Sequence, residues 1–138
     1  MAHTTTSIDI AATPAQVWQL IGGFDSLPDW LPYIPSSTLS AGGRIRHLAN
    51  PAGEVIVEQL EAYDNTARSY SYSILRAPFP ATDYLSTLQV SAIAGGDGAR
   101  VTWSGRFTPA GVSEQEVTEL FHGIYVAGLE ALQQTLTR

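Results

Sequence analysis

Cysteine and lysine are both absent from this sequence of 138 residues. Without cysteine, the chain has no disulfide, no thiolate nucleophile, no iron–sulfur cluster and no cysteine-type zinc site. Without lysine, no side chain can form a Schiff base, which excludes lysine-aldolase and pyridoxal chemistry. Any chemistry of this chain therefore rests on its carboxylates, arginines, hydroxyls and aromatic rings.

Charged residues and long apolar runs are also scarce. Thirteen acidic and seven basic residues give a formal net charge of -6. The arginines are scattered and do not form the basic face that nucleic-acid binding requires. No apolar run approaches the ~20 residues of a membrane-spanning helix, and residues 1–6 do not look like a signal peptide. We expect a cytoplasmic protein with neither nucleic acid nor membrane as a partner.

The chain is long enough and apolar enough to fold around a core. With 44% hydrophobic residues and no repeat or linker, residues 1–138 are expected to form a single domain. Alternation and capping signals predict, in order, a strand at 7–10, a helix at 14–22, a helical turn at 27–30, strands at 44–50, 54–63, 67–76, 83–93 and 100–108, and a helix at 114–137.

The order of these elements predicts an α+β fold. Consecutive strands favour an antiparallel meander, and the long C-terminal helix has an apolar side that a curved sheet of six or seven strands would cover. One helix fills only part of such a concave face. We therefore expect a cavity between the helix and the sheet.

Several short segments carry a resemblance to a known family. They are ATPAQVW at 12–18, LPDWLP at 27–32, EQL at 58–60, PATDY at 80–84 and GIY at 123–125. Together with the element order, they resemble the polyketide cyclase/dehydrase-like branch of the START/Bet v 1 superfamily (SRPBCC) over the whole chain. The resemblance implies the helix-grip fold and an internal site for hydrophobic or aromatic small molecules, which some members cyclise, dehydrate or isomerise.

A hairpin loop brings two opposite charges together. The sequence PAG at 51–53 has glycine where a bulged hairpin needs a left-handed residue, and the register that follows places Arg46 opposite Glu58. Continuing this register through the next turn sets Glu58 opposite Tyr72. We predict a row of Arg46, Glu58 and Tyr72 across three strands, on the face of the sheet that turns towards the helix.

This row has two interpretations. In the catalytic one, Glu58 carries a proton and Arg46 orients the ligand or stabilises an oxyanion beside Tyr72, which suits enolisation, dehydration or aldol-type cyclisation. In the structural one, Arg46 and Glu58 form an ion pair on the sheet and Tyr72 packs against it.

Aromatic residues give the predicted cavity its lining. The strand positions of Tyr84, Trp103 and Phe107 favour side chains that face the cavity, where they contact a planar ligand or form core. Trp30 lies with Pro32 and Tyr33 near the expected entrance, either as a lid or as an anchor for the loop.

The three histidines show no metal-ligand spacing, and no metal or cofactor is indicated. His122 lies near Tyr125 on the C-terminal helix, at the edge of the apolar stripe. It either reaches the cavity as a base or lies on the surface. We count His122 and Tyr125 as candidate ligand contacts.

The sequence thus predicts a protein that binds a hydrophobic or aromatic small molecule, as a monomer or a homodimer. The first hypothesis is a cofactor-independent cyclase, dehydratase or isomerase, and the alternative is a non-catalytic carrier or sensor. An enzyme needs an acid or base left free to face the ligand, whereas a carrier satisfies its polar groups internally. A third possibility, a protein-interaction module, would show a filled cavity.

Overall fold

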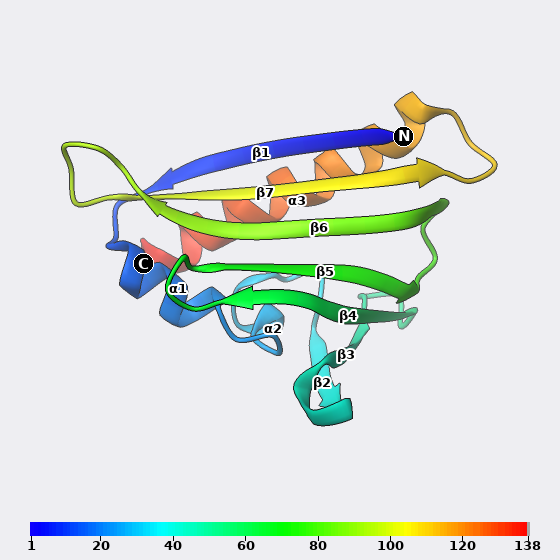
Figure 1. The fold of residues 1–138 in the computed structure, drawn as a ribbon, viewed down its shortest axis with the longest axis horizontal. Coiled ribbons are helices and arrows are strands. Elements are labelled where there is room, and N and C mark those ends of the chain that lie inside the picture. Colours follow the sequence, from blue (N-terminus) through cyan, green and yellow to red (C-terminus); the bar gives the residue numbers. More distant parts are fainter. Residues whose placement is uncertain (138) are drawn as a thin grey trace.

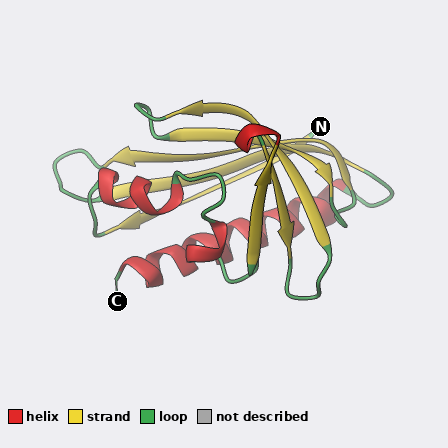
Figure 2. Ribbon diagram, turned by 90° about the horizontal axis from the view of Figure 1, so that it is seen from below, coloured by secondary structure: helices red, strands yellow, loops and turns green. Residues whose placement is uncertain are grey.

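The computed structural model describes residues 1–137, so residue 138, the last of the predicted domain, lies outside the described residues. One curved antiparallel sheet covers a long C-terminal helix (Figures 1 and 2). The elements are β1 (Ala2–Ile10), α1 (Pro14–Ile21), α2 (Leu27–Trp30), β2 (Ser36–Ser40), a 3-10 turn (Ala41–Gly43), β3 (Ile45–Ala49), β4 (Val55–Asp64), β5 (Ser69–Arg76), β6 (Ala81–Ala92), β7 (Ala99–Pro109) and α3 (Glu114–Leu136).

The seven strands pair in the order β1-β7-β6-β5-β4-β3-β2. All neighbouring strands are antiparallel. The first strand, β1, pairs with the last strand, β7, so the end of the meander lies beside the beginning of the chain. Helix α3 runs beneath β1 and β7, α1 contacts β6 and β7, and α2 contacts β2 and α3 (Figure 1). This is the predicted helix-grip fold.

Local capping explains where the helices begin. Thr13 accepts a hydrogen bond from the backbone N–H of Gln16, whose side chain accepts one from the Thr13 N–H in return, which is the predicted capping box of α1. The hydroxyl of Ser113 caps α3 by accepting a hydrogen bond from the backbone N–H of Glu116. Ser26 precedes α2, but its hydroxyl is buried and makes no hydrogen bond within residues 1–137, so it does not cap this helix.

The register between β4 and β5 differs from the prediction. Tyr72 lies opposite Leu60, and Glu58 lies opposite Ile74, two residues further along β5 than expected. The turn between β4 and β5 lies later in the chain than predicted, because the Asp64 carboxylate accepts the N–H groups of residues 66 and 67. A bulge in β4 then moves the pairing one residue back towards the predicted register. The net shift is even, so Tyr72 keeps its predicted face.

Two strands also differ in extent. The edge strand β2 (Ser36–Ser40) was not predicted as a separate strand, because its residues are polar or exposed and show no clear alternation. The first strand begins at Ala2 rather than at Ser7, since Thr4 and its neighbours pair with β7. Residues 3–6 are polar, so no alternation of apolar and polar side chains marks them as part of a strand.

Two glycines allow α3 and β7 to lie very close together. A Cβ at Gly105 of β7 would collide with the Tyr125 hydroxyl, and a Cβ at Gly128 of α3 would lie 2.7 Å from the Trp103 ring. The rings of Trp103 and Tyr125 stack with centroids 4.6 Å apart. The Tyr125 side chain of α3 thus lies against Gly105 of β7, and the Trp103 side chain of β7 lies against Gly128 of α3.

Candidate active site

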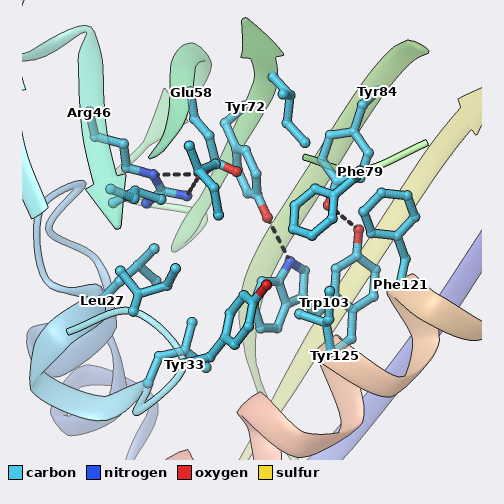
Figure 3. A pocket seen from close by; sticks show the side chains of 16 residues that line it. Leu27, Tyr33, Arg46, Glu58, Tyr72, Phe79, Tyr84, Trp103, Phe121 and Tyr125 are labelled. Atoms are coloured by element: carbon cyan, nitrogen blue, oxygen red, sulfur yellow. Dashed lines mark hydrogen bonds and ion pairs between the residues drawn. The ribbon is translucent and has the colours of Figure 1, made fainter. Parts of the chain in front are cut away.

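A cavity of about 40 Å³ lies between the sheet and α3. Charged, hydroxyl and aromatic side chains from six elements, β3 to β7 and α3, converge on it (Figure 3). The lining includes Tyr33, Arg46, Glu58, Tyr72, Phe79, Tyr84, Trp103, Phe121, Ile124 and Tyr125. The predicted cavity is therefore present, although most of its space is filled by side chains.

Arg46 and Glu58 are paired across β3 and β4, as the hairpin predicted. Arg46 Nε donates to Glu58 Oε1 over 2.8 Å, and Arg46 Nη2 lies 2.7 Å from the same oxygen. The side chains are 1% and 8% exposed, so this is a buried ion pair. Buried pairs are costly to break, because the charge that remains has lost its compensation.

Further contacts hold the Arg46 guanidinium in place. Nη1 donates to the Phe24 carbonyl over 3.1 Å and to the Tyr70 hydroxyl over 3.2 Å. The guanidinium also lies over the rings of Phe24 and Tyr72, at 4.2 and 4.6 Å from their centroids. Burial opposes its charge, but Tyr70 and Glu58 outweigh burial and raise the pKa of Arg46. Arg46 is therefore a fixed cation whose N–H groups are mostly occupied.

Glu58 keeps one oxygen without a partner. Both contacts with Arg46 use Oε1, and no hydrogen bond within residues 1–137 reaches Oε2. Burial raises the pKa of Glu58, and the attraction of Arg46 offsets this only in part. A buried carboxylate with a raised pKa and a free oxygen on a cavity is a stronger proton acceptor than an exposed carboxylate.

The other end of the cavity contains a chain of hydroxyl groups with a fixed direction. Ser86 donates its single proton to the Ser104 carbonyl over 2.8 Å, so it can only accept from Tyr125 at 3.3 Å. Tyr125 in turn accepts from the Tyr84 hydroxyl. Burial is the main reason why the pKa of Tyr84 is well above its ordinary value and that of Tyr125 is about 12. These groups remain neutral donors.

Tyr72 lies between these two ends. Its hydroxyl accepts a hydrogen bond from Trp103 Nε1 over 3.1 Å, and no hydrogen bond found among the described residues uses its own proton (Figure 3). Burial, helped by the negative charge of Glu58, keeps the pKa of Tyr72 well above its ordinary value. The cavity therefore offers one acceptor at Glu58 Oε2 and one donor at Tyr72.

The structure brings six of the nine predicted site residues to the cavity and leaves three outside its lining. Phe107 is fully buried in the core against Phe121. Trp30 is 2% exposed and packs edge-on against Trp103, which fits its interpretation as an anchor. His122 is exposed and its Nδ1 shares a hydrogen bond with Thr4, on the side of α3 away from the cavity lining.

Tyr70 and Ser86 were missed by the sequence analysis. Both lie on strand positions of the same parity as predicted inward residues, Tyr72 on β5 and Tyr84 on β6. Ser86 was visible as a small polar residue among large inward ones. The turn of Tyr33 towards the cavity and the place of Phe79 on the β5–β6 connection depend on loop conformations, which leave no periodic signal.

Comparison with known proteins places the chain in a family. The sequence profile of the family described as "Polyketide cyclase / dehydrase and lipid transport" matches residues 1–137. The chain belongs to this family. Its membership confirms the resemblance inferred from the sequence. Comparison with curated proteins gave no match.

Solved structures of this family and fold agree with the architecture. The protein XoxI from Bacillus cereus is 60% identical, with a TM-score of 0.97 over 99% of this chain and 96% of its own. A START superfamily protein from Mycobacterium smegmatis is 14% identical, with a TM-score of 0.81 over 99% and 98%. The Zhui aromatase/cyclase from Streptomyces is 13% identical, with a TM-score of 0.79 over 99% and 93%. The last two show the fold alone.

Within residues 1–137, His, Asp and Glu side chains form no group of three that could hold a metal ion. None of the described helices is long and apolar enough to cross a membrane.

Proposed function

We propose that this protein binds an apolar or aromatic carbonyl compound between the sheet and α3 and catalyses a cofactor-independent proton transfer on it. The observation that carries the proposal is the unpartnered Glu58 Oε2 on the cavity, opposite a free donor at Tyr72. This is the free base that separates an enzyme from a carrier.

The reaction begins at a carbon next to the carbonyl group. The Glu58 carboxylate takes a proton from that carbon, the C–H electron pair moves towards the carbonyl oxygen, and Tyr72 donates a hydrogen bond to the enolate that forms. Glu58 then returns the proton to a different carbon, which gives isomerisation, or to a departing hydroxyl, which gives dehydration. Attack of the enolate on a second carbonyl of the same molecule gives cyclisation.

Arg46 acts in this proposal as a positioning residue. Its hydrogen bonds to Glu58, Phe24 and Tyr70 fix the carboxylate and leave little capacity to bind the ligand, so the oxyanion contact passes to Tyr72. At the far end, the Tyr84 hydroxyl donates to Tyr125 and offers only lone pairs to a ligand. A carbonyl oxygen is therefore bound at Tyr72 rather than at Tyr84.

Hydrogen–deuterium exchange tests the proposal without knowledge of the natural substrate. Acetophenone in D₂O serves as the probe, and NMR follows replacement of its methyl protons. The wild-type protein should accelerate exchange, and Glu58→Gln should slow it by ~10²-fold or more while the probe still binds. The matched control is Glu61→Gln, an exposed residue of the same strand, which should exchange at the wild-type rate.

A carrier remains the second candidate, because the cavity is small and most of its hydroxyl groups bond to one another. Binding of acetophenone without acceleration of exchange, in wild-type protein of normal thermal stability, would support the carrier and overturn the catalytic proposal. A loss of stability in Glu58→Gln with an unchanged exchange rate per folded molecule would lead to the same conclusion.

A further inference from the structure

A groove of about 530 Å³ lies outside the cavity, between the segment at 31–33 and α3. Leu31, Tyr33 and Ile124 line both the groove and the cavity, so these three side chains form the wall between the two spaces. Tyr33 and Ile124 are only partly buried. Side chains, rather than a layer of backbone, therefore separate the cavity from the groove at these positions.

The two spaces differ greatly in size. The inner cavity has about 40 Å³, whereas a cavity that holds a single benzene ring has roughly 150 Å³. Only the reacting group of a ligand fits beside Glu58 without displacing several aromatic side chains. The rest of a larger molecule has to lie elsewhere. A second hollow also adjoins the cavity, at Ile74, Phe79 and Phe121, but its lining includes the polar residues Arg76, Thr82 and Asp83. The groove is the adjoining space that suits an apolar group.

A glycine in the middle of α3 supports the same conclusion. Gly123 lines the groove, and apart from its own helix nothing in the described part of the chain lies within 4 Å of the position of a Cβ there. Glycine weakens a helix interior, so a residue with this cost and no packing neighbour needs another reason. At Gly128, by contrast, the absence of a side chain is required by the Trp103 ring that packs against it. The open space above Gly123 gives the groove its depth.

The lining of the groove indicates the chemistry of what it holds. Pro32, Leu120, Ala127 and Ala131 present an apolar surface, and Glu119 is the one charged residue among those that line it. An uncharged, apolar chain or ring matches this surface, while an anionic group would be repelled by Glu119. The groove also adjoins the cavity onto which the second carboxylate oxygen of Glu58 opens, an oxygen that no hydrogen bond within residues 1–137 reaches.

We propose that the ligand has two parts: a carbonyl head held between Glu58 and Tyr72, and an uncharged apolar tail that lies in the groove on α3. The assignment of the head rests on the proposed function. The assignment of the tail rests on the groove, on its shared wall with the cavity and on Gly123. The substrate class is therefore an elongated ketone rather than a compact one.

Two aryl ketones that differ only in their tails test this proposal. Binding of acetophenone and octanophenone is measured by quenching of tryptophan fluorescence. Octanophenone should bind the wild-type protein at least tenfold more tightly, since burial of about two methylene groups already gives that factor. Ala127→Leu, which fills the groove, should remove most of this advantage and weaken the binding of acetophenone far less than that of octanophenone. Ala62→Leu, at an exposed position of β4 that does not line the groove, is the matched control.

A second variant separates a role in binding from a role in folding. Gly123→Ala should raise the melting temperature, because alanine favours the helix, and should still weaken octanophenone binding. If octanophenone fails to bind, binds no better than acetophenone, or is unaffected by Ala127→Leu and Gly123→Ala, the groove does not hold the tail. A wrong assignment of the head would give a different result. Tyr72→Phe would then leave the affinity of both ketones unchanged, while Ala127→Leu and Gly123→Ala would still weaken octanophenone more than acetophenone.

Discussion

At the β3–β4 end of the cavity a charged pair leaves one oxygen unpartnered, whereas at the β6–α3 end a chain of neutral hydroxyls ends on a backbone carbonyl. Both ends are buried and both use cross-element hydrogen bonds. Only the first end has a carboxyl group, whose pKa is raised by burial and whose second oxygen has no hydrogen bond within residues 1–137. The difference indicates that the charged end is built to exchange a proton and the hydroxyl end to remain fixed.

The largest effect should follow from removing the cation of the charged end. Arg46→Met leaves Glu58 buried without compensation and should lower the free energy of unfolding by about 3–5 kcal/mol, measured by urea denaturation. The pKa of Glu58, already raised by burial, should rise further. A raised native pKa means that stability is retained below the ordinary carboxyl pKa and is lost as pH rises through the raised value. The deficit should therefore be larger at pH 8 than at pH 5.

The exposed ion pair between Arg100 and Asp9 provides the control for this variant. These side chains are 51% and 55% exposed, and solvent screens such a pair, so Arg100→Met should change the stability little. Equal losses for Arg46→Met and Arg100→Met would show that burial of the first pair has no energetic consequence.

Two tyrosine variants compare the ends directly. Tyr72→Phe removes the free donor and should slow deuterium exchange of acetophenone by about 10²-fold, the usual effect of losing an oxyanion donor. Tyr84→Phe removes the first member of the hydroxyl chain and should cost about 1 kcal/mol of stability with little change in exchange. The comparison would fail if Tyr84→Phe slowed exchange as much as Tyr72→Phe.

A smaller effect is expected from crowding the hydroxyl end. Gly105→Ala places a Cβ against the Tyr125 hydroxyl and should destabilise the fold by about 1–3 kcal/mol. The same substitution in a Tyr125→Phe background should cost less, because the colliding oxygen is gone. Thermal unfolding of the four proteins in this cycle measures the coupling, and strictly additive losses would contradict the contact.

The smallest effect concerns the pH profile of exchange. Glu58 acts as a base only when ionised, so the rate should fall as pH decreases through its pKa. Because burial raises this pKa, the midpoint should lie above the ordinary glutamate value of about 4.3. A midpoint at or below that value would place the reactive carboxylate elsewhere.

The sequence was sufficient for the fold because its signals were local and consistent. The caps at Thr13 and Ser113 and the hairpin loop before Glu54 fixed the helices and the pairing of Arg46 with Glu58. The family resemblance, confirmed by the profile match, supplied the same architecture.

The features that were missed depend on geometry rather than on pattern. The later turn at Asp64 shifted the register and a bulge in β4 recovered one position of it. Asp83 has a positive φ of 53° at an irregularity in β6 that no glycine marks. The direction of the hydroxyl chain follows from the single proton of Ser86, which only its contact with Ser104 reveals. The predicted faces of Tyr72 and Tyr84 were correct, because side chains alternate between the two faces of a strand even where its pairing with the neighbouring strand is shifted.

The reciprocal glycine contacts of α3 and β7 also limit how the molecule can move. Sliding or rotating α3 would move Tyr125 off Gly105 and Gly128 off Trp103, so that each ring would meet a residue that carries a Cβ. Changes in cavity size therefore fall to rim side chains such as Tyr33 and Phe79. Such side-chain and loop motions take nanoseconds to microseconds, whereas collective helix shifts take microseconds to milliseconds. Ligand entry should consequently be limited by encounter with the protein rather than by a slow opening of the fold.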